Sequence, residues 1–85
     1  MYEIRLKKQF QKDLKRVARR GKNIDKLETI IDNLQKGHEL ERKHKSHRLK
    51  GIWKPCWECH VESDWLLIWD YSDDGGYLIL VRTGS

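Results

Sequence analysis

Two apolar runs in the last third of the sequence constrain the fold more than any other feature. Residues 65–71 (WLLIWDY) are apolar at both alternating sets of positions, as in a strand that is buried on both faces at the centre of a sheet. Residues 77–82 (YLILVR) form a second run, and the DDGG between the runs is a strong hairpin signal. The sequence therefore predicts an antiparallel pair of strands, with residues 65–71 central.

Three further extended segments are predicted. Apolar and charged residues alternate at positions 2–6, which is the period of a half-buried strand. Residues 49–53 (LKGIW) suggest a short extended segment, and Pro55 excludes a central sheet position there. Residues 56–61 (CWECHV) form the next strand, which a turn joins to residues 65–71. Consecutive strands joined by tight turns pair antiparallel.

Two amphipathic helices are predicted between the first strand and the others. Apolar residues recur at i, i+4, i+7 and i+8 within residues 7–20, and a second apolar face runs through residues 24–36. Gly21 suits the left-handed end of the first helix, and Asn23 is a good N-cap for the second. The short link between the helices makes them an antiparallel pair.

The order strand–helix–helix–strands predicts one α+β domain over residues 1–85. In this fold the two N-terminal helices pack on an antiparallel sheet of four to five strands. No apolar run approaches the ~20 residues of a membrane span, and the N-terminus lacks the apolar core of a signal peptide. We therefore expect a cytoplasmic protein with no membrane partner.

The formal net charge is +5, and basic residues are dense in a polar loop at residues 43–54. Such an excess of positive charge favours a polyanion, for example RNA, DNA or an acidic protein. A solvated basic surface without such a partner is the alternative. Four side chains are candidates for substrate contacts: Lys45, Arg48, Lys50 and Lys54.

Residues 56–60 match C-x-x-C-H, a haem attachment pattern, and C-x-x-C also occurs in redox and zinc sites. A redox pair belongs at a helix N-terminus, whereas this segment is strand-like. Cysteines three positions apart on a strand point to opposite faces, which works against a tetrahedral zinc site. We therefore predict reduced cysteines, at least one of them buried, and no metal or cofactor.

Three residues near the basic loop suit proton transfer, namely His47, His60 and Asp64. If residues 62–63 form a two-residue turn, His60 and Trp65 are cross-strand neighbours on one face, with Asp64 at the rim. A histidine and a carboxylate beside a basic surface can provide general acid–base catalysis of phosphodiester cleavage. RNA carries its own nucleophile, the 2′-hydroxyl, so an RNase needs no metal. The alternative is a structural hairpin in which Asp64 caps the turn and His60 fills a gap.

All four tryptophans lie between residues 53 and 69. Aromatic side chains can stack on unpaired bases, but they also fill protein cores. We expect Trp53, Trp57 and Trp69 to pack within the protein. Trp65 is a further candidate for a substrate contact, and packing within the protein remains open for it as the alternative.

Four motifs occur in order along the sequence. They are H-x-L-x-G-x-W at residues 47–53, E-C-H-V at 58–61, D-W-L-L-I at 64–68 and L-x-R-T-G-S at 80–85. Together they resemble the YafQ branch of the RelE superfamily of bacterial toxins, and the resemblance covers essentially the whole sequence. It implies the toxin of a type II toxin–antitoxin system, acting as a ribosome-dependent mRNA endoribonuclease.

The resemblance also implies a site and partners. Cleavage in the family is attributed to attack by the RNA 2′-hydroxyl, with general acid–base catalysis and no metal. The positions of His47, His60 and Asp64 match those implicated in catalysis or substrate contact, with Trp65 beside them. Arg82 matches an arginine that suits a phosphate contact. The expected partners are the ribosome, mRNA and an acidic antitoxin that wraps the toxin, with a heterotetramer as one assembly.

The sequence departs from the family pattern in two places. Members usually continue after R-x-G-S/T with a histidine, a short spacer and a terminal Leu-Phe, which are not found after Ser85. Relatives also commonly carry arginine at the position of Trp57, so an indole replaces one phosphate contact. The alternative to an enzyme is a non-catalytic basic module that binds RNA or a protein.

Overall fold

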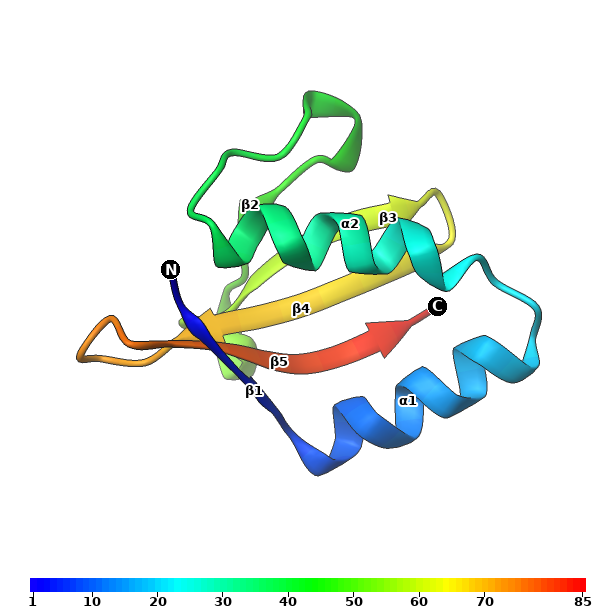
Figure 1. The fold of residues 1–85 in the computed structure, drawn as a ribbon, viewed down its shortest axis with the longest axis horizontal. Coiled ribbons are helices and arrows are strands. Elements are labelled where there is room, and N and C mark those ends of the chain that lie inside the picture. The colour runs from blue at the N-terminus through cyan, green and yellow to red at the C-terminus, as the bar shows by residue number, and fades with distance from the viewer.

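The computed structural model describes residues 1–85 as one five-stranded sheet with two α-helices packed on it (Figure 1). The elements in chain order are β1 (Glu3–Leu6), α1 (Lys8–Arg19), α2 (Ile24–Gln35), β2 (His47–Arg48), β3 (Trp57–Glu62), β4 (Trp65–Tyr71) and β5 (Tyr77–Gly84). Two short 3₁₀ turns, η1 (Arg42–His44) and η2 (Gly51–Trp53), lie on either side of β2. The strand order is β1-β5-β4-β3-β2, so β4 is central, as predicted.

The predicted α+β fold is confirmed, with one strand pairing that differs. The strands from β2 to β5 pair antiparallel with their neighbours, whereas β1 runs parallel to β5. Parallel neighbours need a long connection, and here every element from α1 to β4 lies between the two strands along the chain. The sheet is therefore mixed instead of wholly antiparallel.

Both helices begin and end within a residue of the predicted positions and turn their apolar faces to the sheet. Asn23 caps α2 by accepting a hydrogen bond of 3.0 Å from the backbone N–H of Asp25. Neither helix is long and apolar enough to cross a membrane. The helices and strands enclose one cluster of buried apolar residues: Phe10, Val17, Leu27, Ile30, Leu34, Cys59, Val61, Trp65, Leu67, Trp69, Leu78 and Leu80.

β1 is less buried than its alternating pattern predicts. All four of its residues are exposed, and Ile4 and Leu6 keep 39% and 44% of their surface accessible. The reason is its position at the edge of the sheet, where it has a neighbour on one side only. Tyr2, just before the strand, does pack against the core, with its ring 5.0 Å from that of Tyr71.

The hairpin between β3 and β4 differs in register from the predicted one. Residues 63–64 form the turn, and a bulge between His60 and Glu62 leaves Glu62 opposite Trp65. His60 is opposite Leu66, so the predicted His60–Trp65 pair is wrong. A one-residue shift in register turns a side chain to the other face of the sheet. Consequently Trp65 is buried under the helices, whereas His60 lies between buried neighbours and points to the other face.

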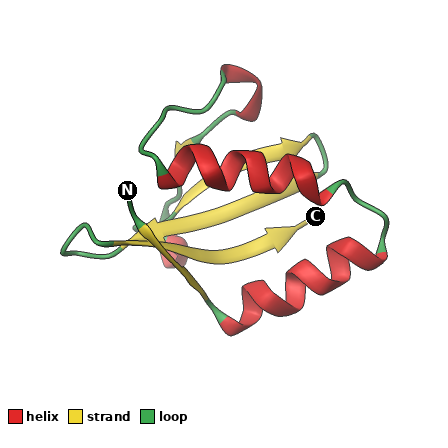
Figure 2. Ribbon diagram, viewed as in Figure 1, coloured by secondary structure: helices red, strands yellow, loops and turns green.

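Residues 49–53 are not extended as predicted. Residues 51–53 form η2, which lies on the face of the sheet away from α1 and α2 (Figure 2). Gly51 has a φ of +67°, a left-handed conformation that glycine adopts without strain and that lets the chain fold back here. As a result Trp53 lies against the sheet instead of extending it.

Candidate active site on the open face of the sheet

A row of side chains crosses four strands on the face of the sheet away from the helices. His47 on β2 is opposite Glu58 on β3. Ile68 on β4 is opposite both Glu58 and Arg82 on β5. Directly opposed residues point to the same face, so the four side chains share this surface, which we call the open face. Neighbouring strands are ~4.8 Å apart, which places the Cα atoms of His47 and Arg82 ~14 Å apart.

His47 is half exposed, and two contacts fix its imidazole. Nδ1 lies 2.9 Å from the backbone oxygen of Lys45, and because a carbonyl only accepts hydrogen bonds, Nδ1 is the donor. Nε2 lies 3.4 Å from a carboxylate oxygen of Glu58. The histidine therefore presents Nε2 to the open face, next to a carboxylate.

His60 lies in the next row of the open face, opposite Leu66. Its backbone oxygen accepts a hydrogen bond of 2.7 Å from Nδ1 of His44. Because His44 belongs to η1, this bond attaches the basic loop to β3 beyond the end of the short β2. The position of the loop next to His60 is thus fixed by a histidine side chain.

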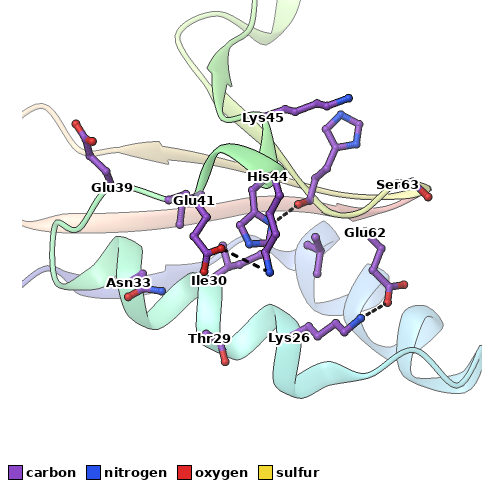
Figure 3. Close-up of a pocket in the computed structure, with 14 residues that line it drawn as sticks. Lys26, Thr29, Ile30, Asn33, Glu39, Glu41, His44, Lys45, Glu62 and Ser63 are labelled. Atoms are coloured by element: carbon purple, nitrogen blue, oxygen red, sulfur yellow. Dashed lines mark hydrogen bonds and ion pairs between the residues drawn. The ribbon is translucent and has the colours of Figure 1, made fainter.

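A hollow of about 560 Å³ lies between α2 and the basic loop (Figure 3). His60 and Lys45 line it, together with charged side chains of both signs. Lys26 and Glu62 form an ion pair of 2.8 Å across it, and this lysine lowers the pKa of Glu62. The hollow is therefore a polar groove in which several charges already have a partner.

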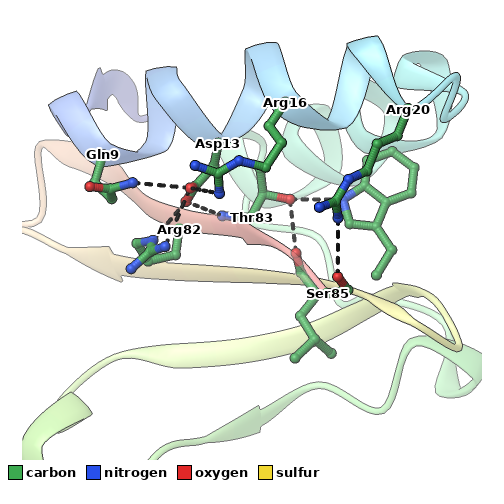
Figure 4. A network of polar contacts seen from close by, with 9 residues as sticks. Gln9, Asp13, Arg16, Arg20, Arg82, Thr83 and Ser85 are labelled. Atoms are coloured by element: carbon green, nitrogen blue, oxygen red, sulfur yellow. Dashed lines mark hydrogen bonds and ion pairs between the residues drawn. The ribbon is translucent and has the colours of Figure 1, made fainter.

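Arg82 is held by Asp13, a carboxylate buried in the apolar face of α1 (Figure 4). Nε and one Nη of Arg82 donate to the two carboxylate oxygens at 2.7 and 3.3 Å. The same carboxylate accepts from Gln9 Nε2 and from the backbone N–H of Thr83, both at 3.2 Å. Burial raises the pKa of Asp13, but these hydrogen bonds outweigh burial and hold the pKa below its usual value. The hydrogen bond to Asp13 in turn raises the pKa of Arg82.

Asp64 lies in the exposed β3–β4 turn and is bound from the helix side of the sheet. Both of its carboxylate oxygens accept hydrogen bonds of 3.3 Å from Nζ of Lys22, which lies between α1 and α2. This contact raises the pKa of Lys22. The structure therefore brings His47, His60 and Arg82 onto one face and leaves Asp64 outside that group.

Trp65 is a core residue, and its prediction as a substrate contact is wrong. Only 1% of its surface is exposed, and its indole N–H donates to the hydroxyl of Thr83 at 2.8 Å. Trp57 and Trp69 pack as predicted, with stacked rings 6.4 Å apart. Trp53 is expected to pack as well, yet 37% of its surface is exposed.

The predicted basic contacts differ in their relation to the open face. Three exposed lysines lie in the segments around β2 and η2: Lys45, Lys50 and Lys54. Arg48 is also exposed, but it alternates with His47 along β2 and lies over the ring of Trp57 at 5.0 Å. Its side chain thus points away from the open face, and the geometry does not support it as a contact for a substrate bound there.

The two cysteines are free thiols, with Cys59 in the core and Cys56 half-buried. Burial raises the pKa of Cys59 to about 12, so this thiol is protonated and unreactive at neutral pH. No group of three or more histidine, cysteine, aspartate or glutamate side chains is placed to hold a metal ion.

A smaller hollow of about 140 Å³ lies on the open face at the Arg82 end of the row. It is lined by Leu66 and Ile68 from β4, Arg82 from β5 and Trp53 from η2, together with residues 83–85. An indole, two aliphatic side chains and a guanidinium therefore meet in one small depression.

The sequence alone does not single out Asp13, Glu58 or Trp53 as parts of this site. Asp13 carried a signal, because it interrupts the apolar face of the first helix, three residues after Phe10 and four before Val17. A carboxylate buried there must be paired. The position of Glu58 on the open face follows from the alternation of side chains along β3. The exposure of Trp53 could not be predicted from the sequence, because it depends on the turn at η2.

Two helices on one face of a mixed sheet, with histidines and an arginine on the other, define a protein of the RelE-like α+β class. The family described as "Bacterial toxin of type II toxin-antitoxin system, YafQ" matches residues 2–85. The chain belongs to this family, and the resemblance seen in the sequence is confirmed.

Individual relatives agree with this assignment. The chain is 34% identical over 84 residues to mRNA interferase toxin YafQ of Escherichia coli K12, covering 98% of this chain and 89% of the relative. It is 38% identical to a metal-bound toxin from Helicobacter pylori, with a TM-score of 0.93 over 100% of this chain and 94% of that one. It is 34% identical to a chain of the E. coli DinJ–YafQ complex, with a TM-score of 0.88 over 100% and 93% of the two chains.

Proposed function

We propose that this chain is a ribosome-dependent mRNA endoribonuclease whose substrate lies across the open face. The observation that carries the proposal is the row from His47 to Arg82, with His60 beside it, on a sheet face that neither α-helix covers. Imidazoles and a guanidinium supply the proton transfer and charge stabilisation that phosphodiester cleavage requires. The E. coli relative is named an mRNA interferase toxin, which supports the same activity here.

In the proposed reaction the 2′-oxygen of one ribose attacks the adjacent phosphorus, and the bond from phosphorus to the 5′-oxygen of the next nucleotide breaks. A base accepts the proton of the 2′-hydroxyl, and an acid donates a proton to the departing 5′-oxygen. The products are a 2′,3′-cyclic phosphate end and a 5′-hydroxyl end. Every group that this reaction needs is a side chain or part of the RNA, so we propose a metal-independent mechanism.

His47 and His60 are the proposed proton-transfer residues. His47 presents Nε2 beside Glu58, and His60 lies one row away on the same face. Arg82 would stabilise the charge that develops on the phosphate oxygens. Because Asp13 fixes Arg82 before substrate arrives, the arginine loses little conformational freedom on binding.

Asp64 has a different proposed role. Its carboxylate is bound to Nζ of Lys22, so we propose that it positions the β3–β4 hairpin instead of transferring a proton. In that case Lys22→Met and Asp64→Asn should lower cleavage to a similar extent. If Asp64→Asn alone lowers cleavage, the carboxylate acts directly on the RNA.

The test is cleavage of a defined mRNA on purified translating ribosomes, with the ends of the products mapped. We expect His47→Ala and His60→Ala each to lower kcat ~100-fold or more, which is the usual contribution of a positioned acid or base. Arg82→Ala should have an effect of similar size. A 2′-deoxyribose at the cut site should abolish cleavage, whereas a chelator should leave the rate unchanged.

His38→Ala is the matched control, because His38 is an exposed histidine in the loop after α2 and lies outside the open face. It should cleave at the wild-type rate. If all three open-face variants also cleave at that rate while remaining folded, the proposed site is wrong. If the wild-type chain binds ribosomes but never cleaves, the protein is instead a non-catalytic basic binding module.

We further propose that an acidic antitoxin binds this toxin, since a DinJ–YafQ complex has been solved for the E. coli relative. The net charge of +5 favours an acidic partner. Ribosomes and mRNA place the proposed activity in the cytoplasm. Light scattering of the toxin purified with the product of its neighbouring gene would test the proposed heterotetramer, and a mass equal to one copy of each chain would contradict it.

A further inference from the structure

Trp53 is unusual among the tryptophans because it is exposed and yet held in place. The residue keeps 37% of its surface accessible, whereas Trp65 and Trp69 keep 1% each. The backbone around it is ordered by hydrogen bonds from Lys54 N to Gly51 O at 3.1 Å and from Cys56 N to Trp53 O at 2.8 Å. The indole is therefore presented on the open face by a folded turn, not by a loose chain.

The surroundings of Trp53 are suited to a flat, partly apolar ligand with a negative charge attached. Leu66 and Ile68 line the same hollow and offer aliphatic surface. Its volume of about 140 Å³ is well below the ~300–1,000 Å³ typical of pockets that enclose whole small molecules. The hollow therefore fits one ring system, with the rest of the ligand outside.

Arg82 supplies the cation at the edge of this hollow. A guanidinium has five N–H donors, and Asp13 takes two of them, so three remain for a ligand. Figure 4 shows Asp13 holding the guanidinium from the α1 side. The remaining donors are thus available for a phosphate at the mouth of the hollow.

We propose that this hollow binds one unstacked RNA base against the indole of Trp53, with the adjoining phosphate at Arg82. The inference rests on the proposed function and names the part of the substrate that binds at this end of the row. Stacking of a base on an aromatic ring is tolerant of sequence. The hollow therefore positions the RNA for cleavage, and Trp53 takes the stacking role that the sequence left open for Trp65.

The first test detects the base directly by following the indole N–H signals of ¹⁵N-labelled protein. The probe is a trinucleotide with 2′-O-methyl riboses, which cannot be cleaved, and its partner probe lacks the central base. We expect the Trp53 signal to shift with the complete probe and to stay in place with the abasic one. The buried Trp65 and Trp69 signals should not move with either probe. Equal shifts of the Trp53 signal with both probes, or none with either, would overturn the proposal.

The second test is the cleavage assay on ribosomes. Trp53→Ala should raise KM about tenfold, in line with the strength of base stacking, with a smaller effect on kcat. Trp53→Phe keeps an aromatic face and should recover most of the loss. Ile52→Ala is the matched control, because Ile52 is 95% exposed in the same turn and does not line the hollow. An unchanged KM for Trp53→Ala would contradict the base site.

The two tests separate this inference from the proposed function. Should the wild-type chain cleave no mRNA, the proposed function fails, and the indole titration alone decides whether the hollow binds a base. Should the chain cleave mRNA while Trp53 responds in neither test, the function stands and the base site is rejected.

Discussion

Asp13 serves both the stability of the fold and the geometry of the proposed site. Only 1% of its surface is exposed, and a buried carboxylate is tolerated only when it is paired and hydrogen-bonded. Arg82, Gln9 and the backbone N–H of Thr83 satisfy that requirement. The same contacts join α1 to β5 and orient the guanidinium on the open face. One residue thus determines whether Arg82 is available in a fixed position.

Replacing Asp13 by asparagine should lower the free energy of unfolding by about 2–3 kcal/mol. The amide keeps the volume but loses the charge in the bond to Arg82, and hydrogen bonds to charged groups contribute about 1.5–3 kcal/mol. Urea unfolding followed by tryptophan fluorescence measures the difference. Asp32→Asn is the control, because Asp32 forms an exposed pair with Lys36 on α2 at 3.0 Å and should change stability by only ~0.3–0.5 kcal/mol. Equal losses of unfolding free energy in both variants would show that the buried pair contributes no more to stability than the exposed pair.

The pH dependence of stability should depend on the same residue. Hydrogen bonds lower the pKa of Asp13 in the folded state, so its contribution is complete above the unfolded pKa of ~3.9 and is lost as the pH falls through the lower, folded value. The stabilities of the wild type and Asp13→Asn should therefore differ at pH 7 and converge below about pH 4. Urea unfolding at a series of pH values measures this convergence. A constant difference down to pH 2 would contradict it.

At the scale of elements, the β3–β4 hairpin decides which aromatic side chains are buried. The bulge between His60 and Glu62 allows His60 to face outward while Trp65, two residues beyond Ser63, faces the helices. Bulges add one residue to a strand and change which face the next side chains occupy. The turn VESD offers several polar residues that suit a turn, so the sequence could not fix the register.

Trp53 and Trp65, which lie on opposite faces of the sheet, should respond differently to truncation. Trp65→Ala removes a buried side chain and its bond to Thr83, and should cost about 3–5 kcal/mol of unfolding free energy. Trp53→Ala removes a side chain that is 37% exposed and should cost less, about 1–2 kcal/mol. Thermal or urea unfolding of both variants measures this. A large loss for Trp53→Ala would mean that its indole is needed for the fold and would complicate its use as a probe of RNA binding.

The helices and long strands could be predicted because their signals are local. Apolar periodicity located α1 and α2 to within a residue, and the strand pattern around the two cysteines correctly predicted that at least one of them is buried. The details of the site depend on long-range contacts instead. Arg82 meets Asp13 across 69 positions of sequence, and only the packing of α1 on β5 brings them together. The same holds for Asp64, which binds Lys22 in the link between α1 and α2.

At the scale of the whole molecule, the two faces of the sheet have different roles, one in packing the core and one in the proposed site. The face toward α1 and α2 is filled by the apolar cluster, whereas the open face carries the polar row and the turn η2. The parallel position of β1 beside β5 could not be read from the sequence, because either edge of the sheet would accept a first strand. It leaves the end of β5 beyond Leu80 free of β1, and Arg82 lies in that uncovered part.

The distribution of positive charge over these two faces leads to a prediction about salt. Three exposed lysines, Lys45, Lys50 and Lys54, lie in the segments next to the open face, so replacing all three by glutamine should remove about three phosphate contacts. Each contact to single-stranded RNA contributes ~0.7 to the slope of log K against log salt, so the slope should become shallower by about 2. Fluorescence anisotropy of a labelled single-stranded RNA at several salt concentrations measures it. The control variant replaces three exposed lysines of α1, Lys8, Lys12 and Lys15, and lowers the net charge equally on the helix side. If that variant flattens the slope as much, the RNA responds to net charge alone and does not bind at the open face.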